Sequence, residues 1–179
     1  MHLLIFRHAK SGHPASVDDF DRPLCDEGNA AAPLIGSWIR DHDLEPAAVL
    51  CSSARRTKET LALVLPFFRT SPKIEYERGL YLSGVAALLG KIRKAPAASP
   101  LMIVGHNPGL HEMALALLAR QQRGEAKIRA EELSRKFPPA GLVVLEFKLR
   151  DWAGLKPATA QLAYFVRPKA LMRTQDSDS

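Results

Sequence analysis

The sequence has little of what a disulfide-stapled or zinc-bound protein needs, because only two of its 179 residues are cysteines. Cys25 and Cys51 are too few for a disulfide framework or for the usual zinc cluster. Both are therefore expected to be packing residues, and a reducing, cytoplasmic compartment fits them best. The apolar run before Arg7 is also too short for a signal peptide.

Long apolar runs, basic arms and aromatic residues are scarce as well. The longest uncharged stretch, from Ala95 to His111, is interrupted by three prolines, so no membrane span is expected. Lysine and arginine number 25 against 19 aspartates and glutamates, and the net charge of +6 favours a phosphate-bearing partner. With 7% aromatic residues and no basic arm, that partner is not expected to be nucleic acid.

Four motifs of common enzyme classes are missing. The stretch from Gly84 to Lys91 has one residue too many between its glycines for a phosphate-binding loop. His111-Glu112 begins a zinc-protease pattern, but Leu115 stands where the second histidine is required. Neither G-x-S-x-G nor G-x-G-x-x-G occurs, which excludes the standard serine hydrolases and dinucleotide-binding enzymes.

Short apolar runs alternate along the chain with longer segments of helical spacing. The short runs predict strands and the longer segments predict helices, with Ser83 expected to cap the third helix. The expected strands are Leu3–Phe6, Val49–Cys51, Lys73–Tyr76, Leu101–Val104, Leu142–Phe147 and Leu162–Val166. The expected helices are Asp26–Arg40, Thr57–Phe68, Val85–Arg93 and Pro108–Arg120.

This order of elements predicts an α/β fold, a three-layer sandwich with helices on both faces of a mostly parallel central sheet. The last two strands follow one another after a short connection containing Gly and Pro, so they are expected to form an antiparallel pair. The polar residues 121–139 are expected to form a solvated helix or a lid. Residues 1–170 are expected to form one domain, followed by a disordered tail over 171–179.

Arginine and histidine residues follow three of the expected strands. Arg7 and His8 follow the first strand, Arg55 and Arg56 come shortly after the second, and His106 follows Leu101–Val104. Because the carboxyl ends of parallel strands meet at one edge of a sheet, these side chains are expected to converge there. Clustered cations need an anionic partner, and a guanidinium fork matches phosphate oxygens. The pattern predicts a phosphate pocket with neutral, nucleophilic imidazoles near pH 7.

These residues resemble the motifs of the histidine phosphatase superfamily, which also contains the cofactor-dependent phosphoglycerate mutases. The matching motifs are Arg7-His8 after a strand, Ser52-x-x-x-Arg56-x-x-x-Thr60 at a helix start, and Gly105-His106. Within the superfamily, several further segments are similar to SixA-type phosphohistidine phosphatases. They are residues 7–11, 19–24, 80–81, 104–110 and 136–138. The resemblance covers the chain from about Leu3 to Pro168.

The resemblance implies a covalent mechanism. His8 would attack phosphorus in line and become phosphorylated, and water would then hydrolyse the phosphohistidine. Arg7, Arg56 and His106 would hold the phosphoryl oxygens and stabilise the transition state. Arg56 is chosen over its neighbour Arg55 because the family's arginine lies four residues before the threonine. No metal or other cofactor is expected, because these residues form no carboxylate-rich cage.

Two further groups of residues have open assignments. Arg22 is a candidate additional phosphate contact, and its alternative role is an ion pair with Asp19 or Asp21. Ser52 and Ser53 are the other nucleophiles expected at the edge of the pocket. The loops over residues 12–18 and 121–139 are expected to influence substrate choice.

The chain departs from mutase-type members, which have Gly and then Glu or Gln where this sequence has Ala9 and Lys10. Glu77 is the nearest candidate for the mutases' acidic proton donor. A phosphoester needs such an acid, whereas imidazole leaves a phosphoramidate readily, so a missing acid favours a phosphohistidine substrate. The expected partner is a histidine-phosphorylated protein, such as a phosphotransfer domain or phosphocarrier. The alternatives are a phosphatase of small phosphomonoesters and a phosphate-binding module with weak or no catalysis.

Overall fold

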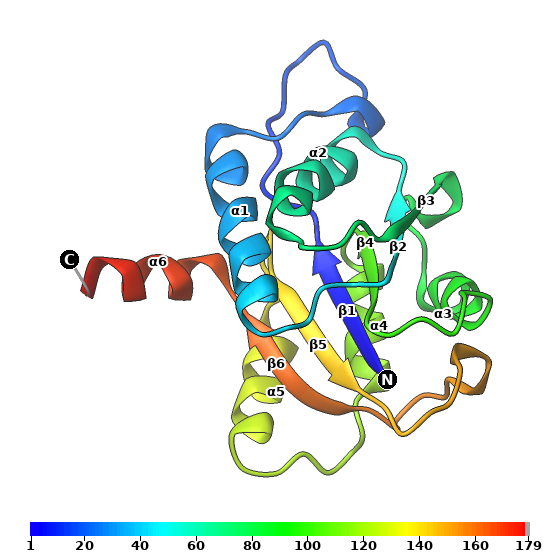
Figure 1. The fold of residues 1–179 in the computed structure, drawn as a ribbon. Coiled ribbons are helices and arrows are strands. Elements are labelled where there is room, and N and C mark those ends of the chain that lie inside the picture. Colours follow the sequence, from blue (N-terminus) through cyan, green and yellow to red (C-terminus); the bar gives the residue numbers. More distant parts are fainter. Residues whose placement is uncertain (178–179) are drawn as a thin grey trace.

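The central layer of the fold is a six-stranded sheet with the strand order β3-β2-β4-β1-β5-β6. A computed structural model describes the backbone of residues 1–177 and the side chains of residues 1–172 (Figure 1). The strands are β1 (His2–Arg7), β2 (Ala48–Ser52), β3 (Lys73–Glu77), β4 (Leu101–Gly105), β5 (Leu142–Glu146) and β6 (Gln161–Val166). Strands β1 to β4 are parallel, whereas β5 is antiparallel to both β1 and β6. The mostly parallel sheet with a C-terminal antiparallel pair is thereby confirmed.

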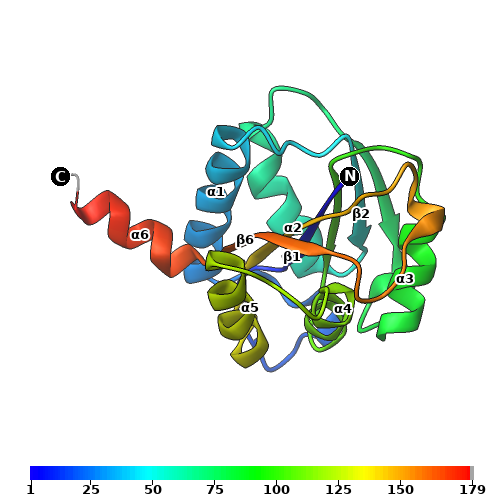
Figure 2. The same ribbon diagram turned by 90° about the horizontal axis from the view of Figure 1, so that it is seen from below.

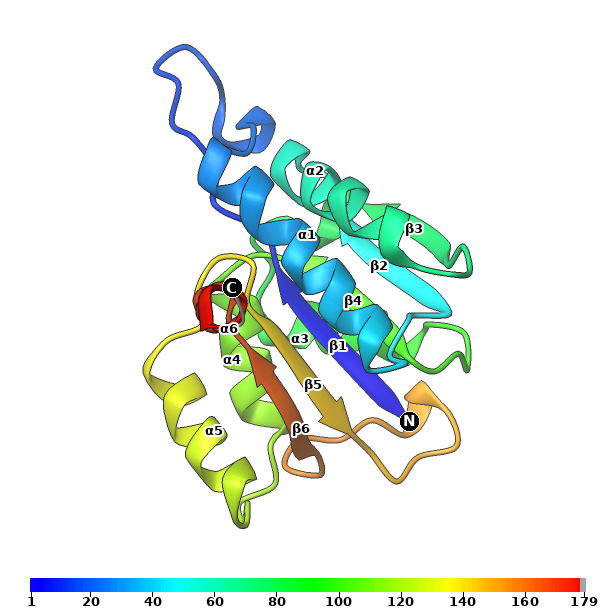
Figure 3. The same cartoon turned by 60° about the vertical axis from the view of Figure 1, so that its left-hand side comes forward.

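Helices cover both faces of this sheet, as the sequence predicts (Figure 2). They are α1 (Asp26–Asp41), α2 (Arg55–Val64), α3 (Val85–Arg93), α4 (Gly109–Leu117), α5 (Glu125–Arg135) and α6 (Pro168–Ser177). Helices α1 and α2 pack on the face that Leu4 and Phe6 of β1 point to, whereas α3, α4 and α5 pack on the face of Leu3 and Ile5 (Figure 3). Successive residues of a strand point to opposite faces of the sheet. Because helices bury both faces here, every residue of the central run of β1 is apolar.

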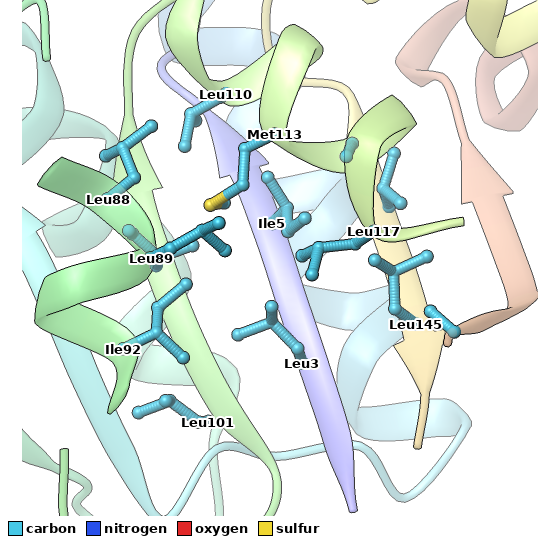
Figure 4. Packing of buried hydrophobic residues seen from close by; sticks show 14 of the residues in the cluster. Leu3, Ile5, Leu88, Leu89, Ile92, Leu101, Leu110, Met113, Leu117 and Leu145 are labelled. Atoms are coloured by element: carbon cyan, nitrogen blue, oxygen red, sulfur yellow. The ribbon is translucent and has the colours of Figure 1, made fainter. Parts of the chain in front are cut away.

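The core on the α3 and α4 face shows how the helical spacing is used. Leu88 and Ile92 of α3 and Met113 of α4 meet Leu3 and Ile5 of β1 in one buried cluster (Figure 4). All five side chains are at most 2% exposed. Burying one such side chain contributes about 1.5–3 kcal/mol. The helices are therefore held to β1 and β4, the strands whose ends carry the histidines.

Three local predictions were wrong in detail. Helix α2 ends at Val64 and continues only as a 3-10 turn, Leu65–Phe67, because Pro66 has no N–H to extend an α-helix. Helix α4 ends at Leu117, because the backbone of Leu118 is extended and forms a β-bridge with Ala160, the residue before β6. Ser83 does not cap α3: Gly84 holds the cap position, and the Ser83 hydroxyl donates to the carbonyl of Gly79.

The C-terminal part contains the polar helix that the sequence predicts. Residues 125–135 form α5, in which only Leu133 is buried and Arg129 pairs with Glu125 one turn earlier. The segment expected to be a disordered tail is helical as far as residue 177, because Leu171 and Met172 pack against the α1 face of the core. Residues 178 and 179 lie outside the described residues. None of the helices within residues 1–177 has both the length and the apolar character of a membrane span.

Candidate active site

Strands β1, β2 and β4 end at the same edge of the sheet (Figure 1). The five predicted site residues, which follow these strands or the loop after β1, come together in one pocket. They are Arg7, His8, Arg22, Arg56 and His106, and they line a pocket of about 530 Å³. Strands β1 and β4 end side by side, with Arg7 opposite Gly105, so the two histidines that follow lie close together. Helix α2 begins directly after β2 and places Arg56 in its first turn. The chemical roles of the five residues stay predictions.

The ring of His8 is held by its own main chain. Its Nδ1 lies 2.8 Å from the carbonyl oxygen of Ala9, which can only accept a hydrogen bond, so Nδ1 carries the hydrogen. The other ring nitrogen, Nε2, therefore keeps its lone pair. The Ala9 N–H in turn donates to the hydroxyl of Thr60 at 2.9 Å, which explains the threonine of the sequence motif.

Burial and positive charge keep His8 neutral. Desolvation, with smaller contributions from Arg56 and Arg7, lowers the pKa of His8 to about 4, although the Ala9 hydrogen bond opposes the shift. The pKa of His106 is lowered to about 3 by desolvation and by the nearby His8 and Arg56. Both imidazoles are thus uncharged near pH 7, as the sequence predicts.

His106 uses its other ring nitrogen, Nε2, for its hydrogen bond. Its Nε2 lies 2.9 Å from the hydroxyl oxygen of buried Ser52, and this oxygen also accepts the N–H of Ala54 at 3.5 Å. The Ser52 hydroxyl can donate to Nε2 or accept from it. The other ring nitrogen of His106, Nδ1, is buried and has no hydrogen-bond partner among the described residues.

Arg7 is oriented by a main-chain carbonyl. Its Nη1 donates to the carbonyl of Phe137 at 2.7 Å, and Nδ2 of Asn107 donates to the same oxygen at 3.0 Å. Three buried polar atoms have no partner in the described part of the chain: Nε of Arg7, Nδ1 of His106 and the acceptor Oδ1 of Asn107. Such unpartnered buried groups are rare in folded proteins, and here they gather beside the pocket.

Asp19 is a pocket residue that the sequence analysis does not single out as part of the site. Both its carboxylate and its main-chain carbonyl accept hydrogen bonds from Arg56, the carboxylate at 3.0 Å. Arg22 donates to the same carboxylate at 2.7 Å, and the hydroxyl of Tyr81 donates as well. Arg22 thus lines the pocket and also forms the ion pair that was its alternative role. Arg56 likewise has a carboxylate partner within the chain, so its burial does not by itself require an external anion.

Other sequence candidates lie outside the pocket. Arg55 is exposed and pairs with Glu59 at 2.6 Å. Glu77 pairs with Lys91 at 2.6 Å, a contact that lowers the pKa of this carboxyl, and it does not line the pocket. The prediction that Ser52 and Ser53 lie at the pocket edge was wrong: neither lines it, and Ser52 is fully buried. Ser11, which the sequence analysis overlooks as a nucleophile, does line it.

No group of three or more His, Cys, Asp or Glu side chains in the described part of the chain could hold a metal ion.

Comparisons with known proteins agree with this geometry. No family profile matches the sequence. The solved structure of a candidate phosphohistidine phosphatase SixA from Nakamurella multipartitia is 32% identical, with a TM-score of 0.77 over 93% of this chain and 95% of that one. The chain belongs to the SixA-type family of the histidine phosphatase superfamily. A second candidate SixA, from Agrobacterium tumefaciens, is 27% identical with a TM-score of 0.77 over 93% and 97% of the two chains.

Curated relatives of this SixA-type chain are uncharacterized. A protein from Mycobacterium tuberculosis is 35% identical over 164 residues, which is 91% of this chain and 99% of the relative. A protein from Mycobacterium leprae is 32% identical over 168 residues, with the same coverage of both chains. Only the solved structures, and not these curated relatives, therefore indicate an activity for the family.

Proposed function

We propose that this protein is a phosphohistidine phosphatase that works through a phosphohistidine intermediate on His8. The observation that carries the proposal is the hydrogen bond from His8 Nδ1 to the Ala9 carbonyl. It leaves Nε2 unprotonated in a pocket that also contains Arg7, Arg56 and His106. A neutral imidazole beside phosphate-binding groups is a nucleophile suited to phosphoryl transfer.

In the first step, Nε2 of His8 forms a bond to phosphorus while the bond from phosphorus to the substrate imidazole breaks. The bonding electron pair leaves with that imidazole, which departs neutral when its other nitrogen is protonated. In the second step, water attacks phosphorus, the electron pair of the P–N bond returns to Nε2, and the proton of the water goes to the phosphate. Because the Ala9 carbonyl keeps Nδ1 protonated, His8 can leave in this step without an external acid.

The remaining groups supply charge. Guanidinium groups of Arg7, Arg56 and Arg22 and the neutral ring of His106 would hold the equatorial phosphoryl oxygens, whose charge is redistributed in the transition state. These groups also stand in for a divalent cation, so we propose a reaction independent of metals.

A lack of acid at the pocket supports a phosphohistidine substrate. The one carboxylic acid among the described residues that line the pocket is Asp19, and its pKa is held below the usual range by the Tyr81 hydroxyl and by Arg22 and Arg56. Glu77 is engaged by Lys91. An alkoxide leaving group needs a proton from such an acid, whereas imidazole does not. We therefore propose a histidine-phosphorylated protein, either a phosphotransfer domain or a phosphocarrier, as the partner.

A panel of phosphate donors tests this function. Purified protein is incubated with phosphohistidine-containing phosphotransfer domains and phosphocarriers, and separately with sugar phosphates and an aryl phosphate, and released phosphate is measured. Turnover restricted to phosphohistidine donors supports the proposal. Faster turnover of sugar phosphates would favour a small-molecule phosphatase on the same site, and binding without turnover would favour a non-catalytic module.

The two free cysteines, Cys25 and Cys51, support a cytoplasmic setting for this reaction.

A further inference from the structure

Asp19 places a negative charge inside a pocket that otherwise collects positive charge. It belongs to a short 3-10 turn, Asp19–Asp21, in the loop between β1 and α1. It is the one carboxylate among the described residues lining the pocket, where it lies with Arg7, Arg22 and Arg56. A pocket meant only to attract phosphate would gain nothing from a carboxylate at this position.

The carboxylate is fixed by donors from three separate segments, although 48% of its side chain is exposed. Arg22 bonds to Oδ1 at 2.7 Å, and Arg56 bonds to Oδ2 at 3.0 Å. The hydroxyl of Tyr81 also donates to Oδ2. Tyr81 is itself held in place, because its ring lies edge-on to Phe20 with centroids 5.0 Å apart, and to the ring of His106 with centroids 5.3 Å apart.

These contacts argue against a proton-transfer role for Asp19. Both oxygens already accept hydrogen bonds, and the donors favour the ionised form, so the group is neither a proton donor nor an effective base near pH 7. A carboxylate and a phosphoryl group are, however, both oxyanions that match a guanidinium fork. Asp19 therefore binds the same donors that a phosphoryl oxygen would use.

We propose that Asp19 is a positioning residue with a second effect: it orients Arg22 and Arg56, and its charge lowers the affinity of the pocket for free phosphate. This inference rests on the proposed function, in which inorganic phosphate is the second product. A site with several unpaired cations binds a dianion in the ground state as well as in the transition state, which slows product release and does not speed chemistry. An internal carboxylate offsets the ground-state attraction while keeping the arginines in position.

Direct binding of inorganic phosphate tests the inference without relying on turnover. Isothermal titration calorimetry compares the wild type with Asp19→Asn, and Asp21→Asn serves as the matched control. Asp21 is exposed and does not line the pocket, so its replacement makes the same change in net charge elsewhere on the same turn. We expect Asp19→Asn to bind phosphate more tightly by on the order of tenfold, the size of a partly screened charge interaction at a pocket edge. The control is expected to stay within about twofold of the wild type.

Two further variants separate charge from packing. Tyr81→Phe removes one hydrogen bond but keeps the carboxylate, so its phosphate affinity is expected to stay well below that of Asp19→Asn. Asp19→Ser removes the same charge with a smaller side chain and should tighten binding as Asp19→Asn does, which covers the case in which one variant folds poorly. In steady-state kinetics, Asp19→Asn is expected to show a lower inhibition constant for phosphate together with a lower kcat.

The outcomes are distinct. Phosphate binding to both Asp19 variants that equals or is weaker than that of the wild type would overturn the inference and leave Asp19 as a structural anchor only. Equal tightening in Asp21→Asn would attribute the effect to net charge and would also overturn it. Failure of the wild type and of both Asp19 variants to bind phosphate would instead overturn the proposed function, because no form of the pocket would then hold the product.

Discussion

The imidazoles of His8 and His106 lie 5.1 Å apart, centroid to centroid, with their planes tilted by 54°. Their partners differ: His8 uses Nδ1 to bond a main-chain carbonyl, whereas His106 uses Nε2 to bond the hydroxyl of Ser52. His8 therefore offers an unprotonated Nε2, whereas the Nε2 of His106 is already engaged by Ser52. This difference supports the proposed role of His8 as the nucleophile, although both rings are neutral.

The first prediction concerns the titration of His8. Because desolvation lowers its pKa to about 4, the ring is expected to stay neutral from pH 8 down to about pH 5 and to protonate near pH 4. NMR of the ring protons between pH 3 and 8 measures this directly. A midpoint for His8 near 6.5, the ordinary value, would contradict the lowered pKa.

The same shifts predict how stability depends on pH. His8 and His106 bind protons less readily in the folded chain than in the unfolded chain, whose histidines titrate near 6.5. Between about pH 6.5 and 4 the unfolded state thus binds more protons, so the free energy of unfolding falls as pH falls. Urea unfolding at pH 7 and pH 5 measures the change, and His8→Gln is expected to lessen it. A pH dependence that is the same in His8→Gln would contradict the assignment.

Replacing Arg56 tests whether its guanidinium stabilises the phosphoryl group, and the neighbouring Arg55 serves as the control. Arg56→Ala is expected to lower kcat/KM by about 10²–10³, by analogy with the loss of one oxyanion donor, because its guanidinium lies in the pocket. Arg55→Ala removes an exposed arginine that pairs with Glu59 and should leave kcat/KM within about twofold of the wild type. Steady-state kinetics with a phosphohistidine donor compares the two. Equal losses would mean that general charge, and not a specific contact, determines the rate.

The chemistry of the covalent intermediate identifies the nucleophile. A phosphoramidate on His8 is expected to be labile in acid and to persist in alkali, because protonation turns imidazole into a good leaving group. A serine ester on Ser11, the serine that lines the pocket, should instead survive acid. The protein is allowed to react with a donor that carries labelled phosphate, and the reaction is then quenched. The sample is divided between acid and base, and the label retained on the protein is counted. His8→Ala should retain no label and no turnover; label that survives acid or remains in this variant would move the covalent role elsewhere.

Treatment with a chelator tests the independence from metals. Full activity is expected after incubation with EDTA, since arginines and neutral imidazoles supply the positive charge and the hydrogen-bond donors. Phosphate release before and after dialysis against the chelator is the measurement. Loss of activity that a divalent cation restores would require a different mechanism.

The sheet could be predicted from the sequence because its signals are local. Strand β1 is a short apolar run because both of its faces are covered, and the residues that follow it must then lie at the sheet edge. Arg7, His8 and His106 could be placed for the same reason. Their convergence follows from strand direction alone and needs no knowledge of loop structure.

The part of the pocket that loops build could not be predicted in this way. Asp19 lies in a turn without apolar periodicity, and its position depends on Arg56 and Tyr81, which are 37 and 62 residues away. Only the spacing of Asp19 and Arg22 gave a local signal, and it indicated their ion pair but not the contacts of Asp19 with Arg56 and Tyr81.

Ser83 was wrongly predicted as a cap for a different, local reason: its hydroxyl bonds the carbonyl of Gly79 in the preceding turn.

The carbonyl groups of Ala9 and Phe137 have a consequence for how this site tolerates change. They orient the guanidinium of Arg7 and the ring of His8, yet a main-chain carbonyl is present whichever amino acid occupies the position. A mutational scan that exchanges one side chain at a time would detect His8 and Arg7 but would leave these two acceptors in place. Inserting or deleting a single residue beside Ala9 or Phe137 shifts the acceptor itself, so the site should be far more sensitive to the length of these segments than to their composition.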